Sequence, residues 1–179
     1  RGMLSVSEES LLLHICAYLL SYPDAEWQSY LPAVKDELQK VKQTQLKETL
    51  SDVIAYIEGE DSAEYEDEFV RVFDFSGNTH LYLAAYNRSN EGQQADQLLA
   101  YKQFFLDNGF DVEKELPDYL PAVLELAATV SPEERKRILD YAKDKLEILR
   151  QRLIDAKQVQ AFILDAILSV AGREERESV

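Results

Sequence analysis

Apolar residues recur along this chain at the spacing of an α-helix, and this period limits the fold more than any other feature. One such stripe, at i, i+4, i+7, i+8 and i+11, consists of Leu46, Leu50, Val53, Ile54 and Ile57. No stretch of useful length alternates apolar and polar residues, and the 179 residues include only six Gly and five Pro, few for a β-rich fold. The sequence therefore predicts an all-α fold, a single bundle-like domain of about eight to ten helices.

Hydroxyl and carboxylate side chains mark the expected helix starts. The predicted N-terminal caps are Ser7, Asp24, Thr79 and Ser131. Pro32 falls inside the second apolar stripe and predicts a kink there, or a split into two short helices. The expected helix ends are Gly59, Gly109 and Gly172.

These boundaries give an expected domain organisation. Residues 3–172 would form the all-helical domain, and residues 1–2, which precede Met3, are interpreted as an expression scar. Residues 173–179 are highly charged and are expected to be a frayed tail, which a longer native chain would extend.

Acidic residues outnumber basic ones, 34 Asp and Glu against 19 Lys and Arg, so the formal net charge is -15. Such a chain repels nucleic acid and anionic membrane surfaces and attracts basic partners over about one Debye length, roughly 8 Å at physiological salt. Acidic surfaces are also common because they keep proteins soluble. The charge thus excludes nucleic acid as an expected partner and gives only the sign of the real one.

The sequence also suggests a compartment. No apolar run approaches the roughly 18 residues that span a bilayer, and no signal-peptide pattern opens the chain. The lone cysteine, Cys16, lies among apolar residues, as expected for a buried thiol in a reducing environment. We therefore expect a cytoplasmic protein with no direct membrane insertion.

Residues that could carry catalysis or bind a metal are few. Neither histidine, His14 or His80, stands at the Glu-x-x-His spacing of di-iron bundles, and no His-Glu-x-x-His occurs. His14 and Cys16 are two residues apart, so on a helix they point in different directions. Glycine-rich phosphate loops are absent. The sequence predicts no catalytic residue, no metal site and no cofactor site, and hence no enzyme.

Aromatic residues gather between positions 65 and 86. Tyr65, Phe69 and Phe73 fall at i, i+4 and i+8 on one helical face. Tyr82 and Tyr86 form a second i, i+4 pair. Three rings at helical spacing are more often core than a binding groove, whereas tyrosines suit half-wet grooves because the hydroxyl needs a hydrogen-bond partner. Both interpretations, core and groove, remain open from the residues alone.

An ordered set of motifs resembles one known family. The set consists of Phe73-Asp-Phe-Ser, Thr79-x-Leu-Tyr-Leu, Leu98-Leu-x-x-Lys102 and Glu115-Leu-Pro-Asp-Tyr-Leu-Pro-x-x-Leu-Glu125. Between Tyr65 and Ala128 the chain is similar to the nitrate reductase molybdenum cofactor assembly chaperones, also called the NarJ or delta subunit family. They belong to the redox-enzyme maturation chaperones. Each motif alone is weak, but the set, in order and at this spacing, is specific.

The resemblance implies an all-helical cytoplasmic chaperone that is neither an enzyme nor a subunit of the finished complex. Its implied partner, or client, is the apo catalytic (alpha) subunit of respiratory nitrate reductase, chiefly the N-terminal segment. The chaperone would hold this subunit for molybdenum cofactor insertion before membrane docking. The segment is basic and partly apolar, so an acidic, tyrosine-lined helical groove would suit it. We expect a monomer.

The candidate client-binding residues come from the aromatic segment and the last motif. They are Tyr65, Phe69, Phe73, Asp74, Tyr82, Tyr86, Asp118, Tyr119 and Glu125. The aromatic members would line or underlie the groove, and the acids would face basic client residues or cap local backbone. One alternative is a chaperone for a different molybdoenzyme, of the dimethyl-sulfoxide or trimethylamine-oxide reductase type. A helical enzyme is another, disfavoured because no nucleophile–base pair is present.

Overall fold

Helices make up the regular structure of the computed structural model, which describes residues 4–86, 91–111 and 116–177. Within these ranges there is no β-strand. In chain order the elements are α1 (Val6–Leu19), α2 (Ala25–Leu38), α3 (Thr44–Glu58), α4 (Ser62–Phe69), the π-helical turn η1 (Val70–Asp74), the 3-10 turn η2 (Leu83–Tyr86), α5 (Glu91–Asp107), α6 (Leu120–Thr129), α7 (Pro132–Asp155) and α8 (Ala161–Glu177). The predicted all-α domain is confirmed. Among these helices none is both long and apolar enough to cross a membrane.

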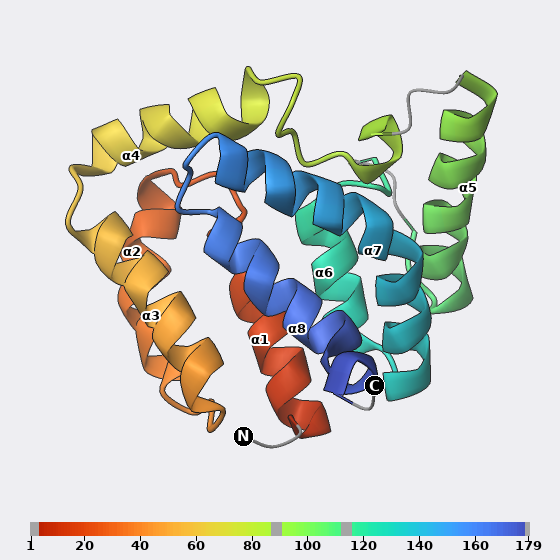
Figure 1. Ribbon diagram of the computed structural model, residues 1–179, viewed down its shortest axis with the longest axis horizontal. Helices are drawn as coiled ribbons and strands as arrows, with labels where there is room; N and C mark the ends of the chain where they lie inside the picture. The colour runs from red at the N-terminus through yellow and green to blue at the C-terminus, as the bar shows by residue number, and fades with distance from the viewer. Residues whose placement is uncertain (1–3, 87–90, 112–115, 178–179) are drawn as a thin grey trace.

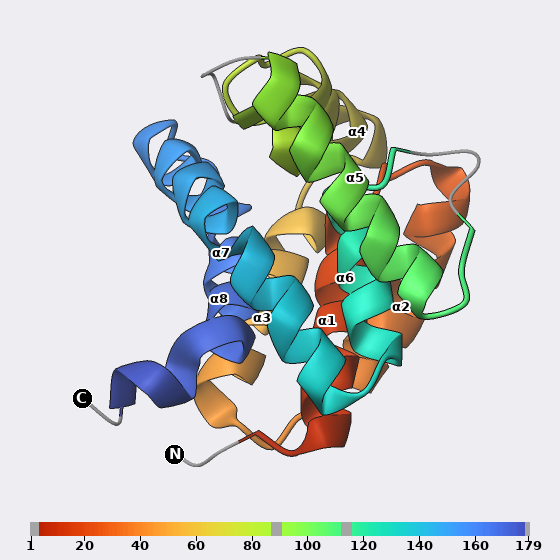
Figure 2. The same cartoon turned by 90° about the vertical axis from the view of Figure 1, so that its right-hand side faces the viewer.

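Helix α1 lies at the centre of the fold, and α2, α6 and α8 pack around it (Figures 1 and 2). Its side chains Leu12, Leu13 and Cys16 are fully buried, and each buried leucine contributes about 1.5–3 kcal/mol of hydrophobic stabilisation. Helices α7 and α8 pack on each other, and α3 packs on α8. Helix α5 lies at the periphery, where Figure 2 shows it on the outside of the bundle.

Side-chain caps determine where the helices begin. The hydroxyl of Ser5 accepts the Glu8 backbone N–H at 3.2 Å, and the Glu8 carboxylate accepts the Ser5 backbone N–H at 3.3 Å. This reciprocal capping box starts α1 two residues before the predicted cap, Ser7, because Glu8 is at the third helical position only when Ser5 is the cap. Asp24 caps α2 and Ser131 caps α7, as predicted.

Of the kink or split predicted at Pro32, the split is wrong: α2 is one helix, and its apolar face stays packed on both sides of the proline. Two other predicted boundaries differ from the structure. Thr79 caps no helix: its hydroxyl donates to the carbonyl of Val72, and only the short turn η2 follows. Helix α8 continues past Gly172 to Glu177, since one glycine inside a helix costs only about 1 kcal/mol relative to alanine.

Two glycines end helices as predicted. Gly59 directly follows α3, and Gly109 follows α5 with a φ of 83°. That angle lies in the left-handed region, which glycine adopts at little cost because it has no Cβ. The helix end at Gly109 therefore depends on the glycine itself.

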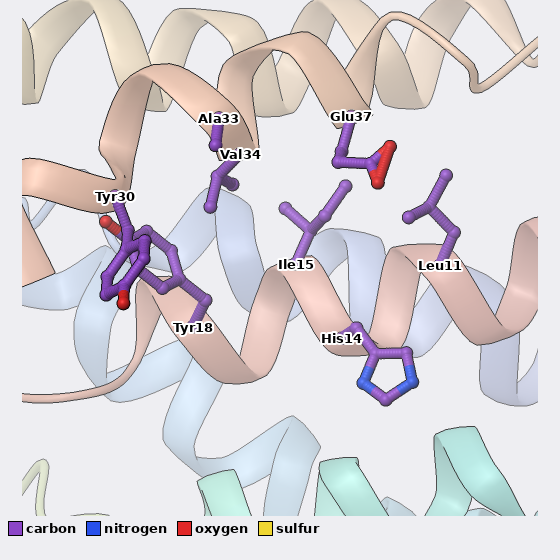
Figure 3. A pocket seen from close by; sticks show the side chains of 8 residues that line it. All are labelled: Leu11, His14, Ile15, Tyr18, Tyr30, Ala33, Val34 and Glu37. Atoms are coloured by element: carbon purple, nitrogen blue, oxygen red, sulfur yellow. The ribbon is translucent and has the colours of Figure 1, made fainter.

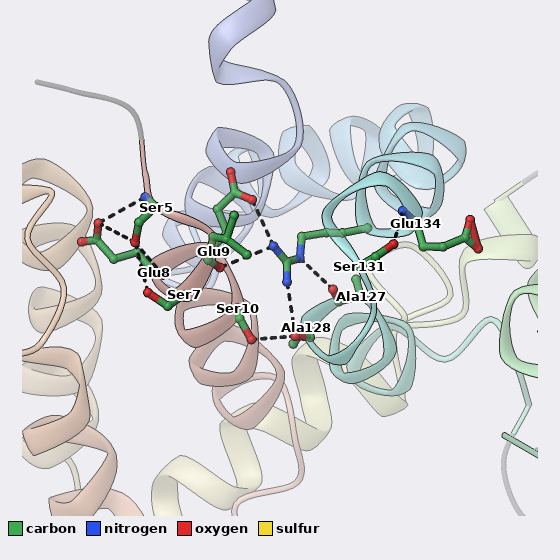
Figure 4. A network of polar contacts seen from close by, with 11 residues as sticks. Ser5, Ser7, Glu8, Glu9, Ser10, Ala127, Ala128, Ser131 and Glu134 are labelled. Carbon is green, nitrogen blue, oxygen red and sulfur yellow. Dashed lines mark hydrogen bonds and ion pairs between the residues drawn. The ribbon is translucent and has the colours of Figure 1, made fainter. Parts of the chain in front are cut away.

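Arg135 is a buried cation that joins three helices. Its Nε donates to the carbonyl of Ala127 at 2.8 Å, and its Nη2 to that of Ala128 at 3.4 Å, at the end of α6. Its Nη1 forms an ion pair with Glu9 of α1 at 3.2 Å (Figure 4). Because the last carbonyls of a helix have no partner within it, the guanidinium satisfies them and fixes α6 against α1.

Candidate functional site

The predicted aromatic stripe on α4 and η1 faces the core. Tyr65, Phe69 and Phe73 are all buried. The Tyr65 ring stacks on the Trp27 ring with 6.2 Å between their centroids, and the ring centroids of Phe69 and Phe73 are 4.8 Å apart. The Tyr65 hydroxyl accepts a hydrogen bond from the Gln160 amide at 3.5 Å. These three rings therefore underlie the surface, and a bound protein could not contact them directly.

At the end of η1 the chain turns outward. The Phe75 backbone N–H donates to the carbonyl of Val70 at 3.0 Å, the i+5 bond of a π-helical turn, and such turns are frequent at functional sites. The Phe75 side chain is 83% exposed, and the predicted site residue Asp74 beside it is exposed as well. Phe75 was not among the predicted site residues, because a single aromatic residue after a helix gives no periodic signal.

A second group of predicted residues meets where two segments cross, which we call the Tyr82–Tyr119 crossing (residues 81–84 and 118–120). The Leu83 N–H donates to the Asp118 carbonyl at 3.1 Å, and the Leu120 N–H donates to the Leu81 carbonyl at 2.8 Å. The rings of Tyr82, which is 39% exposed, and half-buried Tyr119 lie 5.2 Å apart. The motifs around Thr79 and Pro117 are thus joined in space.

Asp118 is the buried acid of the crossing. Its side chain is 1% exposed, and Oδ2 accepts the Ala84 backbone N–H at 3.0 Å. Within the described residues, Oδ1 has no hydrogen-bond partner. Burial raises the pKa of this carboxyl above its usual value, although the Ala84 N–H opposes the rise. The predicted roles were contact with a basic client or capping of local backbone; the carboxylate instead accepts from the distant Ala84, and α6 begins after Tyr119 without a side-chain cap.

Tyr86, at the end of η2, is also buried. Its hydroxyl donates to the His80 carbonyl at 2.6 Å, and its ring stacks on the His80 ring at 4.3 Å. The Arg152 guanidinium of α7 lies over the same ring, 5.2 Å from its centroid. Burial raises the pKa of the Tyr86 hydroxyl. This tyrosine links the crossing to α7, so its contacts are internal.

An open cavity of about 400 Å³ lies elsewhere, between α1 and α2, and we call it the α1–α2 groove (Figure 3). Its lining is Leu11, His14, Ile15 and Tyr18 of α1 and Tyr30, Ala33, Val34 and Glu37 of α2. Each helix contributes residues at i, i+3, i+4 and i+7, so the two sets form two helical faces opposite each other. The two tyrosines lie at one end and Leu11 with Glu37 at the other.

The polar atoms of this groove lie along its edges. His14 Nδ1 is 2.9 Å from Oε2 of Glu125 on α6, and Glu37 forms an ion pair with Lys40 at 2.5 Å. The Tyr18 ring is held in place by stacking on Trp27 at 4.4 Å. Glu125 is thus the predicted site residue that the structure brings to the groove. The sequence prediction missed the rest of the lining, although its helical spacing was visible.

Two kinds of reactive group are relevant among the described residues, a metal-binding cluster and an accessible thiol. No group of three or more His, Cys, Asp or Glu side chains lies close enough to hold a metal ion within them. The Cys16 thiol is fully buried, and burial raises its pKa far above the usual value, so it is not a reactive thiolate. Apolar surface edged with charge favours the capture of an amphipathic partner.

Comparison with known proteins identifies the family. The model of the family described as "Nitrate reductase delta subunit" matches residues 34–159, more than half of the chain. The chain is 30% identical over 172 residues to the "Probable nitrate reductase molybdenum cofactor assembly chaperone NarJ" of Bacillus subtilis, covering 93% of this chain and 91% of that protein.

A shorter match is to the "Nitrate reductase-like protein NarX" of Mycobacterium tuberculosis, found in strains CDC 1551 and H37Rv. It is 31% identical over 100 residues and covers 55% of this chain but 15% of NarX. The family model and the Bacillus relative together carry the assignment: the chain belongs to the nitrate reductase delta subunit family.

Proposed function

We propose that this protein is a chaperone for the assembly of a respiratory nitrate reductase. It would bind the N-terminal segment of the apo catalytic subunit, hold that subunit until the molybdenum cofactor is inserted, and delay membrane docking until then. The observation that carries the proposal is the similarity to the Bacillus subtilis assembly chaperone along nearly the whole length of both chains. That relative is named as a chaperone and not as an enzyme, which agrees with the sequence prediction.

The charge of the chain supports a basic client. With a net charge of -15, it attracts a basic segment and repels nucleic acid. Of the predicted contact residues, Asp74, Tyr82 and Glu125 are exposed and Tyr119 is half-buried, so their side chains are available to a client. The buried residues of the predicted set would not touch the client but would shape the surface that it contacts. We further propose that the protein is cytoplasmic, because it would bind its client before that client docks at the membrane. We also propose that it is a monomer.

Calorimetric titration tests the proposal with a peptide of about fifteen residues from the N-terminus of the catalytic subunit of the same organism. We expect a Kd of about 1 μM or tighter, equivalent to about -8 kcal/mol, that persists at high salt. A scrambled peptide of equal charge is the control. Equal binding of both peptides, lost in salt, would show only that an acidic protein attracts basic peptides.

The same titration separates the client from its alternatives. Peptides from the N-termini of dimethyl-sulfoxide and trimethylamine-oxide reductases should bind at least ten-fold more weakly than the nitrate reductase peptide. Tighter binding of either one would assign the protein to that enzyme instead.

A further inference from the structure

The α1–α2 groove has the form of a receptor for a helix. Its two walls are helical faces, each with side chains at i, i+3, i+4 and i+7. A third helix laid between two others inserts its own side chains, at the same spacing, into the gaps between theirs. The cavity of about 400 Å³ has the volume of a small-molecule site, so it would hold side chains of such a helix and not the whole helix.

The groove lining is mostly apolar and partly open to solvent, although Ile15 is buried. Ala33 of α2 is exposed, Val34 is half-buried, and Leu11 of α1 is half-buried. Tyr30, at the aromatic end, is 55% exposed. Covering these side chains would gain roughly 25 cal/mol for each Å² of apolar surface removed from water. Only the exposed parts of these side chains count, because Leu11 and Val34 also pack against the core, and those parts are apolar surface that a partner could cover.

Acidic side chains on both sides of the groove favour a basic occupant. Glu37 belongs to the α2 wall, and Glu125 reaches the α1 wall through His14. A second copy of this chain would bring its own charge of -15 and would be repelled, whereas a basic amphipathic segment would be attracted. Charge complementarity therefore favours the client over a second copy.

We propose that the α1–α2 groove receives the apolar face of the client's N-terminal segment, bound as a basic amphipathic helix, with Glu37 and Glu125 facing its cations. This assignment rests on the proposed function. It places the helix on α1 and α2 and not on the Tyr82–Tyr119 crossing. Tyr18 and Tyr30 would contact the large apolar residues of the segment with their rings; the Tyr18 hydroxyl donates to the Trp27 carbonyl, and that of exposed Tyr30 would remain near solvent.

Filling the groove tests the proposal. In the Ala33→Trp variant an indole occupies the space of the client's apolar side chains, so the affinity for the fifteen-residue peptide should fall at least ten-fold. The matched control is Ala55→Trp, since Ala55 is exposed in the last turn of α3 and does not line the groove. Its affinity should stay within two-fold of the wild type. Equal affinity of the two variants would overturn the groove assignment.

Removal of a charge gives a second test that does not depend on how Ala33→Trp folds. Glu37→Gln should weaken binding two- to five-fold at low salt, and the difference should shrink at high salt. Glu58→Gln is the control, because Glu58 is an exposed acid in an ion pair with Lys35, away from the groove. Equal effects of the two changes would mean that only net charge matters and would contradict the proposal.

The outcomes distinguish a failure of the groove assignment from a failure of the proposed function. If the wild type binds the peptide but neither groove variant differs from its control, the groove assignment fails and the chaperone function stands. If the wild type treats the native and scrambled peptides alike, the proposed function fails, and the groove assignment fails with it. Dissociation of a dimer of the free protein by Ala33→Trp would identify the groove as a self-interface instead.

Discussion

The Tyr82–Tyr119 crossing and the α1–α2 groove differ in how far their side chains and backbone groups already bind one another within the chain. At the crossing, backbone and side-chain groups bond to one another, as Asp118 does to Ala84, and the aliphatic side chains are buried, so that Tyr82 is its exposed ring. In the groove, Tyr30 and Ala33 are exposed and most of the other apolar side chains are half-buried, while the charged groups lie at the edges. A recognisable motif can thus mark a structural junction, while a surface fit for binding carries no motif.

The largest expected difference between the buried stripe and the groove is in stability. Phe69→Ala removes a buried ring and should lower the free energy of unfolding by about 3–5 kcal/mol, measured by urea denaturation. Tyr30→Ala removes an exposed groove ring and should change stability by only about 0.5 kcal/mol. Peptide affinity should show the reverse order, with a larger loss in Tyr30→Ala than in Phe69→Ala. A loss of affinity in folded Phe69→Ala equal to that in Tyr30→Ala would erase the distinction.

A smaller effect is expected at the crossing itself. Asp118→Ala leaves the Ala84 N–H buried without its acceptor and should cost about 1–3 kcal/mol of stability. The exposed acid Asp74 serves as the control, and Asp74→Ala should stay within about 0.5 kcal/mol of the wild type. If Asp118→Ala lowered peptide affinity and left the unfolding midpoint unchanged, its role would be in client contact and not in the crossing.

The same carboxyl predicts a pH dependence. Burial raises the Asp118 pKa above its usual 3.8, so the folded state holds this proton more tightly than the unfolded state. The contribution of Asp118 to stability therefore falls as the pH rises from about 3.8 through the raised pKa, and the penalty is complete above that pKa. Asp118→Asn cannot ionise there. Urea midpoints from pH 4 to 8 should show wild-type stability falling relative to the variant, and parallel curves would refute this.

The smallest effect is expected at the edge of the groove. The His14–Glu125 pair is largely exposed, so a double-mutant cycle with His14→Gln and Glu125→Gln should give a coupling of about 0.2–1 kcal/mol in stability. Added salt should reduce this coupling. A coupling well above that range would mean that the pair holds α1 to α6 and is not free to turn toward a client.

Helical period could predict the fold because it reports which face of each helix is buried. The predicted stripe on α3 is buried at every position, namely Leu46, Leu50, Val53, Ile54 and Ile57. The same signal could not say what covers a face. On α4 it favoured core but left a groove open, and the approach of Trp27 from α2 and Gln160 from the α7–α8 connection shows that Tyr65 is covered.

The groove escaped prediction for a physical reason. Helix α1 is apolar on most sides, so its period cannot show which side its neighbours leave open. On α2 the stripe through Trp27 and Leu31 is stronger than the adjacent one through Tyr30 and Val34, and the stronger stripe faces the core. Whether the weaker stripe stays uncovered depends on how α1 and α2 meet, which is set by tertiary packing.

The most direct test of the account is a methyl NMR titration of the wild-type protein with the client peptide. The account predicts that the methyl signals of Leu11, Ile15, Ala33 and Val34 shift in proportion to the bound fraction, because these groups line the groove. The methyl signals of Leu83, Ala84 and Leu120, at the crossing, should stay in place. Shifts confined to the crossing, with the groove signals unmoved, would contradict the assignment of the client helix to the α1–α2 groove.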